Sequence, residues 1–318
     1  LVLIARHAPS GENHQVQTHT VADMAEANEI ATAMRRCASP QVITSLKSSG
    51  WVLQNPDVLR LLDKIRNAGR PLGEVVNGKF YYGIKTGFNE AFVIDEAKRA
   101  ELIARDPRSD EIIKPFLRGR DIKRWRVQWA GLYLIKTEIG VNIKRYPAIF
   151  DHLKQYEPQL KKRCDKGKYW WELRACDYYE EFEKPTIRYQ VIASYQQFAY
   201  TREAFLSNDK TWIIPTDDLT VLALLNSPIS WLFLDAIASK LEGGAYELRS
   251  IFVQQVPVPR LETKAKQELG YLAERVVHAE ARVDITSELE QRANEILYSA
   301  FGLTAHEVER VEQFRYKP

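Results

Sequence analysis

The 318-residue sequence has few cysteines, few methionines and no long apolar run. Its three cysteines are odd in number and widely spaced, so they suggest neither a disulfide framework nor a zinc cluster and favour the reducing cytoplasm. No apolar run reaches the roughly 18 residues that a membrane helix needs, and residues 1–5 are too short for a signal peptide. We therefore expect a cytoplasmic protein without a membrane segment. Only two methionines occur and residue 1 is a leucine, so we interpret the chain as a piece of a longer protein.

Motifs of catalysis and cofactor binding are also missing. No Gly-x-Gly-x-x-Gly opens a βαβ unit, so a Rossmann-type cofactor fold is not expected. The six histidines form no i, i+4 pair, which argues against a metal site. Residues 78–86 resemble a P-loop, but an extra residue precedes the lysine and the flanks are β-prone. We interpret this stretch as a turn in which Gly83 and Gly87 supply unusual backbone angles, and we expect no catalytic, cofactor-binding or metal-binding residue in this chain.

The charge of the chain is unevenly distributed. The net charge of +3 is small, but residues 114–174 contain 16 Lys and Arg against six Asp and Glu, together with ten aromatic residues. A dense basic segment is what a phosphate backbone attracts. The rings either stack on bases or form a core beneath a solvated basic face, and composition alone leaves both interpretations open.

The pattern of elements predicts an α+β fold with three parts. Residues 1–70 suggest strands at 1–8 and 14–19 and two helices, one at about 21–36 and one that starts at Pro56 and is ended by Gly69, and we interpret them as a connector. Residues 71–260 consist of short β-prone runs broken by Gly, Pro and Asp, typical of an irregular, mainly-β domain. The runs that we expect to form strands are 78–84, 91–94, 131–135, 186–191 and 211–214, and one short helix is expected from Asp95 to about residue 104. Residues 261–318 are helical, with an apolar seam from Leu269 to Val283 and a capping box that begins at Thr304.

Four stretches resemble a known family. Residues 83–94 (GIKTGFNEAFVI) and 111–125 (EIIKPFLRGRDIKRW), in this order and spacing, resemble the C-terminal target-recognition region of type IIG restriction-modification enzymes and adenine-specific DNA methyltransferases, the TaqI-like specificity domain. Residues 224–228 (LLNSP) and 256–259 (VPVP) are similar to the end of such a domain. The resemblance covers nearly the whole chain.

The resemblance implies a DNA-recognition module whose catalytic parts lie elsewhere. A methyltransferase domain of the same parent chain would bind S-adenosylmethionine, and cleavage in the parent enzyme would need Mg²⁺. This chain would bind double-stranded DNA through side chains in the major groove, while other cations hold phosphates. The residues expected to contact DNA lie in the two longer motifs and, as weaker candidates, in or beside later strands: Lys85, Thr86, Asn89, Arg118, Arg120, Lys123, Arg124, Arg188, Gln190 and Lys210.

Structural roles remain open for these residues. Arg120 could pair with Asp121, and Asn89 could cap a turn. A second functional hypothesis is a protein-protein interaction module, in which the helical seam and the aromatic surface dock a nuclease or methyltransferase partner. A third is an enzyme with a site that the sequence does not show. The DNA sequence recognised, the methylated base and strand, the presence of a nuclease domain and the oligomeric state are not readable from the sequence.

Overall fold

The computed structural model describes residues 14–18, 28–42, 56–279 and 283–316, which fall into two compact units that divide between Asn67 and Ala68. In the first unit β1 (Gln15–Thr18) pairs antiparallel with β2 (Ser39–Val42), and α2 (Ile30–Cys37) lies between them in sequence. Helix α3 (Pro56–Ala68) begins at its proline and ends before Gly69, as predicted. The strand expected at 1–8 and the start of the helix expected at 21–36 lie outside the described residues.

The second unit contains a five-stranded sheet in the order β4, β13, β9, β11, β7. All pairs are antiparallel except β11 with β7. Its central strand β9 buries four successive side chains, so both of its faces are covered, which explains its β-branched and aromatic sequence. The members are β4 (Tyr81–Tyr82), β7 (Trp125–Arg126), β9 (Thr186–Gln190), β11 (Phe198–Thr201) and β13 (Thr211–Pro215).

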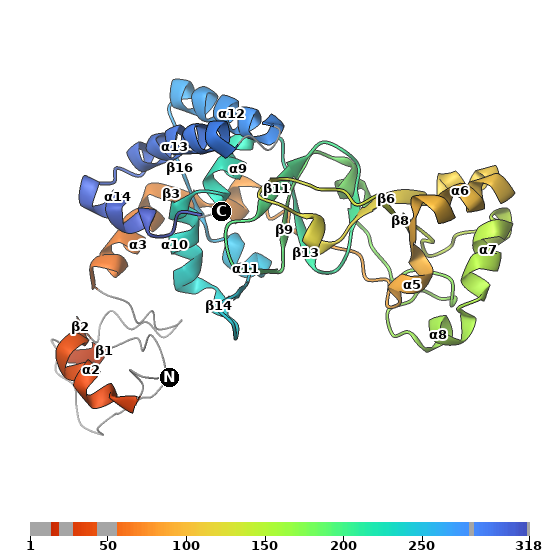
Figure 1. Cartoon of the computed structure of the whole chain (residues 1–318), viewed down its shortest axis with the longest axis horizontal. Helices are drawn as coiled ribbons and strands as arrows, with labels where there is room; N and C mark the ends of the chain where they lie inside the picture. Colours follow the sequence, from red (N-terminus) through yellow and green to blue (C-terminus); the bar gives the residue numbers. More distant parts are fainter. Residues whose placement is uncertain (1–13, 19–27, 43–55, 280–282, 317–318) are drawn as a thin grey trace. The chain divides into compact units, whose positions relative to one another are not determined.

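A four-stranded sheet in the order β12, β6, β8, β5 continues this unit, with α5, α6 and α7 beside it (Figure 1). Its apolar side chains join those of α6, α7 and α8 in one core. Asp95 caps α6 by accepting from the backbone N–H of Lys98, and the predicted helix from 95 is confirmed. The strand expected at 91–94 is only partly correct, because Ala91 and Phe92 belong to a short helix before β5. The bounds are β5 (Val93–Asp95), β6 (Ile113–Leu117), β8 (Leu132–Ile135), β12 (Leu206–Ser207), α5 (Asn89–Phe92), α6 (Glu96–Arg105), α7 (Pro147–Lys154) and α8 (Glu157–Lys162).

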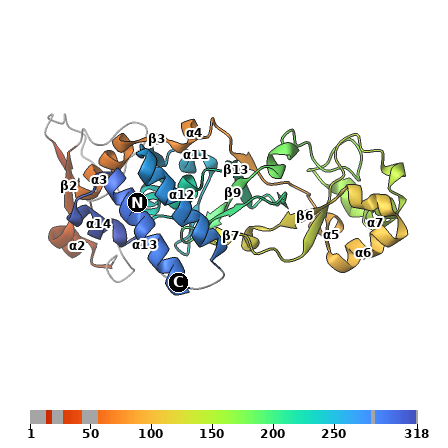
Figure 2. The same cartoon turned by 90° about the horizontal axis from the view of Figure 1, so that it is seen from above.

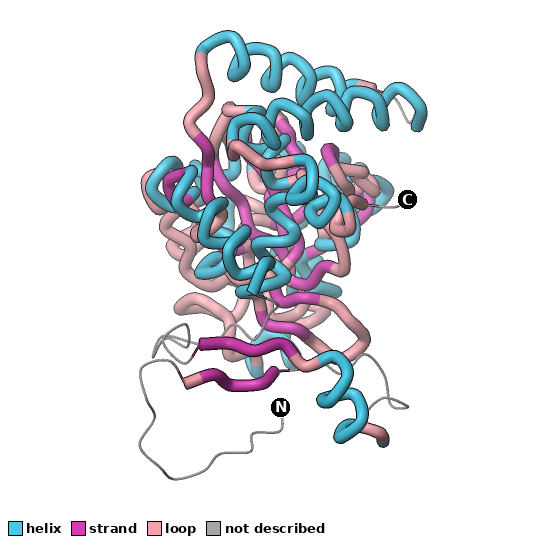
Figure 3. Tube along the Cα trace, turned by 90° about the vertical axis from the view of Figure 1, so that its left-hand side faces the viewer, coloured by secondary structure: helices cyan, strands magenta, loops and turns pink. Residues whose placement is uncertain are grey.

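The helical end of this unit packs on α9. Helices α12 and α13 lie side by side and contact α9 (Figures 1 and 2). Figure 3 shows the same two helices as a hairpin. The long seam helix expected to reach Val283 ends at His278, whereas the capping box at Thr304 and Glu307 is confirmed. The bounds are α9 (Leu219–Leu225), α10 (Pro228–Ile237), α11 (Ser250–Val253), α12 (Thr263–His278), α13 (Val283–Ala300) and α14 (Ala305–Glu312).

Short elements complete the unit. They are α4 (Leu72–Val75), η2 (Pro107–Glu111), η3 (Gly119–Asp121), η4 (Ile143–Arg145), η5 (Tyr179–Glu183), β10 (Ile192–Ala193), β14 (Ser239–Lys240), β15 (Tyr246–Glu247), β3 (Gly69–Pro71) and β16 (Pro257–Pro259). The predicted α+β class is confirmed, while the boundaries expected at 70 and 260 stay predictions. No single helix of the described residues is long and apolar enough to cross a membrane; α9 and α10 meet that test only as a pair, across a bend of 61°.

Candidate nucleic-acid interface

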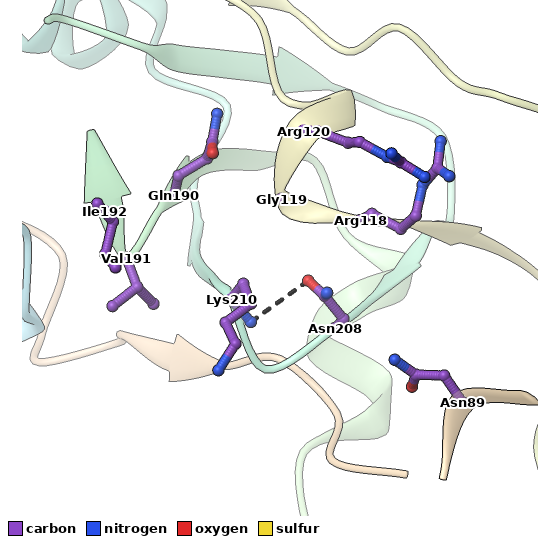
Figure 4. A pocket seen from close by; sticks show the side chains of 9 residues that line it. All are labelled: Asn89, Arg118, Gly119, Arg120, Gln190, Val191, Ile192, Asn208 and Lys210. Atoms are coloured by element: carbon purple, nitrogen blue, oxygen red, sulfur yellow. Dashed lines mark hydrogen bonds between the residues drawn. The ribbon is translucent and has the colours of Figure 1, made fainter. Parts of the chain in front are cut away.

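A pocket of about 400 Å³ brings together five of the ten residues expected to contact DNA. It is formed where the start of α5, the η3 turn, the end of β9 with β10 and the turn before β13 meet (Figure 4). No aspartate or glutamate is among its lining residues, so its polar groups are cations and amides. The lining consists of Asn89, Arg118, Gly119, Arg120, Gln190, Val191, Ile192, Asn208 and Lys210.

The η3 turn holds one arginine rigidly and leaves the next one free. Arg118 donates from Nε to Asp121 Oδ2 at 3.1 Å and from Nη2 to Oδ1 at 2.8 Å, and its backbone N–H also donates to Oδ2 at 2.8 Å. These hydrogen bonds raise the pKa of Arg118. Arg120 is exposed and has no ion-pair or hydrogen-bond partner within the described chain. The internal pair considered for Arg120 and Asp121 is therefore made by Arg118 instead.

The first motif forms a tight turn that presents Asn89 to the pocket. Thr86 is 3% exposed, and its hydroxyl donates to Asn89 Oδ1 at 2.6 Å and accepts from the backbone N–H of Phe88 at 3.2 Å. Gly87 adopts a φ of +68°, as its position in the turn requires. Thr86 thus supports the turn from inside, whereas Asn89 is exposed. Lys85 is half-buried and does not line the pocket.

Gly83 allows two backbone segments to approach closely, and it does not adopt the unusual backbone angle that we expected. A Cβ at this position would lie 1.7 Å from the carbonyl oxygen of Asn208. This approach lets Ile84 bridge to Asn208, so the first motif joins the turn that contains Lys210. On the other side, the same turn lies against Gly119, whose Cβ would come within 3.4 Å of Lys210. The two glycines therefore assemble the pocket.

Two later candidates complete the opposite wall of the pocket. Gln190 is half-buried at the end of β9, and its Nε2 donates to the carbonyl of Ile122 at 3.3 Å. The side chain of Lys210 is 67% exposed and lies 3.5 Å from Asp209, a surface pair that costs little to break. Both side chains can reorient toward a ligand. Lys123 is exposed on the loop that follows η3 but does not line the pocket.

Arg124 and Arg188 face the protein interior. Arg124 Nη1 donates to the carbonyl of Asn226 at 2.8 Å, and Nη2 lies 2.6 Å from Glu290 Oε2. Arg188 is fully buried and donates to Thr186 Oγ1 at 2.9 Å and to the carbonyl of Phe205 at 2.7 Å. Burial lowers the pKa of Arg188 to about 9. Because their guanidinium groups are already engaged inside the protein, we correct the expectation that these two arginines contact DNA.

Comparison with known proteins finds a family match that includes every residue lining the pocket except Asn89. Residues 114–258 match the family of TaqI-like C-terminal specificity domains. The resemblance inferred from the motifs is confirmed. A curated relative, the type II methyltransferase M.PaeR7I of Pseudomonas aeruginosa, is 21% identical over 272 residues, which are 81% of this chain and 44% of that protein. The chain thus spans less than half the length of this relative.

Two solved structures are also similar. The type IIL restriction-modification enzyme MmeI, in complex with DNA, matches with a TM-score of 0.57 and 14% identity over 74% of this chain and 34% of that one. This likeness supports the fold. The type IIG restriction endonuclease BpuSI matches with a TM-score of 0.46 and 11% identity over 86% of this chain and 35% of that one.

Within the TaqI-like region, defined as residues 114–258, the second and third motifs meet through Asn226. Its side-chain amide donates to the carbonyl of Phe198 at 2.9 Å, and its Oδ1 accepts from the N–H of the same residue at 3.2 Å. Arg124 of the second motif donates to the backbone carbonyl of Asn226. Trp125, at a φ of +73°, donates from Nε1 to Glu290 of α13. The two motifs therefore form one polar cluster beneath the η3 turn.

Sequence reasoning missed part of the pocket of the TaqI-like region. The triplet 208–210 is a polar turn directly before the strand predicted at 211–214, and this signal could have identified Asn208. Ile192 carried no such signal, because an isoleucine beside a predicted strand reads as core, yet it is 51% exposed. No cluster of three His, Cys, Asp or Glu side chains that could hold a metal occurs among the described residues.

Proposed function

We propose that this chain is the sequence-specific DNA-recognition module of a restriction-modification adenine methyltransferase, and that the pocket at η3 is where it contacts double-stranded DNA. The observation that carries this proposal is the convergence of Asn89, Arg118, Arg120, Gln190 and Lys210 without an acidic lining residue. The match of residues 114–258 to the family of TaqI-like C-terminal specificity domains supports the same function.

The roles of the pocket residues follow from their freedom to move. Arg120 and Lys210 are exposed cations and suit phosphates or the acceptor edge of guanine. Asn89 and Gln190 present amides, which pair with adenine in the major groove. Arg118 is held by Asp121, so it offers a donor in a fixed direction. Lys123 would add a phosphate contact beside them.

The remaining steps belong to the parent enzyme. We propose that residues 1–70 connect to a methyltransferase domain of the same chain, that residues 71–260 recognise DNA and that residues 261–318 support them. S-adenosylmethionine would supply the methyl group, and Mg²⁺ would assist cleavage. Residues of this chain do not fit either group, because the sequence lacks a glycine-rich βαβ turn and the described residues lack a metal cluster. This chain's contribution is to grip the duplex from which the target adenine is extruded.

The alternative is a module that docks a nuclease or methyltransferase partner. Its complex would persist at high salt, whereas DNA binding fades because phosphate contacts release counterions.

The test is binding of the intact chain to a random-sequence 40-base-pair duplex across a salt series, followed by selection of the bound sequences. We expect Arg120→Ala and Lys210→Ala to weaken binding about tenfold or more, which is the range for one lost base or phosphate contact. Lys123→Ala should lower the salt slope by about one. Arg292→Ala, an exposed arginine on α13, is the control and should change neither. Binding that is absent at low salt, or equal for all four variants, contradicts the proposal.

A further inference from the structure

Two surface loops of the basic segment, residues 114–174, expose apolar side chains beside the pocket. Ile139 is 51% exposed and Tyr169 is 45% exposed, and we call this pair the exposed edge. The ring of Tyr169 stacks on Trp171 with centroids 4.6 Å apart and an interplanar angle of 6°. Composition left open whether the rings of the basic segment form a core or stack on bases. Most of the other rings pack into the core, whereas Tyr169 remains available at the surface.

Buried charges hold both loops in place. Glu172 is 1% exposed, and its carboxylate accepts from the backbone N–H of Gly140 at 2.9 Å and from that of Tyr169 at 2.9 Å. Thr137 donates from its hydroxyl to the carbonyl of Trp171 at 2.6 Å. A buried carboxylate is costly unless its acceptors are satisfied, and here it is satisfied by two backbone groups on the two loops. The exposed edge is therefore preorganised.

Arg163 ties the exposed edge to the pocket. It is 5% exposed and donates to the carbonyls of Trp170 at 2.7 Å, of Glu172 at 2.9 Å and of Thr86. The hydroxyl of Thr86 in turn holds Asn89, which lines the pocket. Since one guanidinium reaches both sides, the exposed edge and the pocket are neighbours on one rigid framework.

The charge around the exposed edge fits a polyanion. Residues 144–174 contain nine Lys and Arg against four Asp and Glu. One of these acids, Glu172, points inward, and two others are paired, Glu157 with Lys161 and Asp165 with Arg174. Lys168 is exposed, and its Nζ lies 5.5 Å from the centre of the Tyr169 ring. An apolar pair with an exposed lysine beside it matches a sugar-phosphate backbone better than it matches an apolar protein surface.

We propose that Ile139 and Tyr169 form a second DNA contact, which packs against the sugars of duplex DNA next to the segment held in the pocket, with Lys168 on a phosphate. This inference rests on the proposed function of the pocket. It assigns to the module a contact with flanking DNA, which adds affinity without reading a base.

The experiment measures binding of the intact chain to a fixed 40-base-pair duplex. Tyr169→Ala and Ile139→Ala should each weaken binding about fivefold without changing the salt slope, because neither side chain is charged. Lys168→Ala should lower the slope by about one. The matched controls are Tyr271→Ala and Ile251→Ala, whose parent side chains are 58% and 50% exposed on α12 and α11, and they should leave affinity unchanged.

A hydroxyl-radical footprint separates the possible outcomes. With Tyr169→Ala, protection should shrink at one end of the protected stretch and persist at the other. If the wild type and the pocket variants behave as proposed but Tyr169→Ala and Ile139→Ala match their controls, the inference is overturned and the proposed function stands. If the wild type binds no duplex at any salt concentration, the proposed function itself fails. Circular dichroism of each variant verifies folding, which these exposed substitutions should preserve because the loop hydrogen bonds use backbone groups.

Discussion

Replacement of Glu290 by glutamine should destabilise the loop beneath the pocket. The Glu290 carboxylate accepts from Arg124 at 2.6 Å and from the indole of Trp125. The side chains of Arg124 and Glu290 are only 10% and 18% exposed. Removing one partner of a buried pair costs about 3–5 kcal/mol, but glutamine keeps one acceptor oxygen and Asn226 still binds Arg124. We therefore expect Glu290→Gln to lower the free energy of unfolding by about 2 kcal/mol.

The assay is urea unfolding followed by tryptophan fluorescence, with a double-mutant cycle that combines Glu290→Gln with Arg124→Ala. A coupling energy of about 1 kcal/mol or more between the two sites is expected, because the groups share one network. The control is Glu268→Gln on α12, whose ion pair with Arg292 is 37% and 54% exposed and should contribute less than about 0.5 kcal/mol. Equal small losses for the two glutamine variants, with no coupling, would refute the assigned role of Glu290.

Two further predictions concern the core. Burial lowers the pKa of His152, whose Nε2 lies 2.9 Å from the carbonyl of Ala91. As pH falls, the imidazole is therefore protonated in the unfolded chain before it is protonated in the folded one, so the free energy of unfolding should decrease below about pH 6.5. His152→Gln should make this decrease smaller, as measured by unfolding at about pH 7.5 and 5.5. Gly83→Ala should lower the free energy of unfolding by more than about 3 kcal/mol, because its Cβ would meet Asn208 at 1.7 Å. At Gly78 a Cβ would meet nothing within 4 Å, but φ is +70°, so Gly78→Ala should lower the free energy of unfolding by only about 1 kcal/mol. Similar losses for Gly83→Ala and Gly78→Ala would contradict the steric role of Gly83.

The sequence predicted local elements better than the partners of its charged side chains. Helix α6, with its cap at Asp95, depends on neighbouring residues, so its signal lies within one stretch of sequence. The role of Arg124 depends on Glu290, which lies 166 residues away, and nothing near Arg124 indicates that partner. The amino-acid sequence does not distinguish an exposed arginine from a buried one. Arg188 shows a different limit: its partners Thr186 and Phe205 lie only 2 and 17 residues away, but nothing in the strand sequence of residues 186–190 marks its side chain as buried.

The same contacts divide the pocket into a fixed wall and a replaceable one. Arg118 makes three hydrogen bonds to the buried Asp121, so changes on the η3 wall disturb the turn itself. Gln190 makes one long hydrogen bond, and Lys210 has one weak surface partner, so substitutions there should change what the pocket contacts at little cost in stability. A module that selects DNA sequences needs this combination, because a rigid wall fixes the register of the duplex while an exchangeable wall sets which bases are accepted. On the function that we propose for the pocket, varying Gln190 and Lys210 with the η3 turn left intact should change which sequences are selected from a random duplex pool.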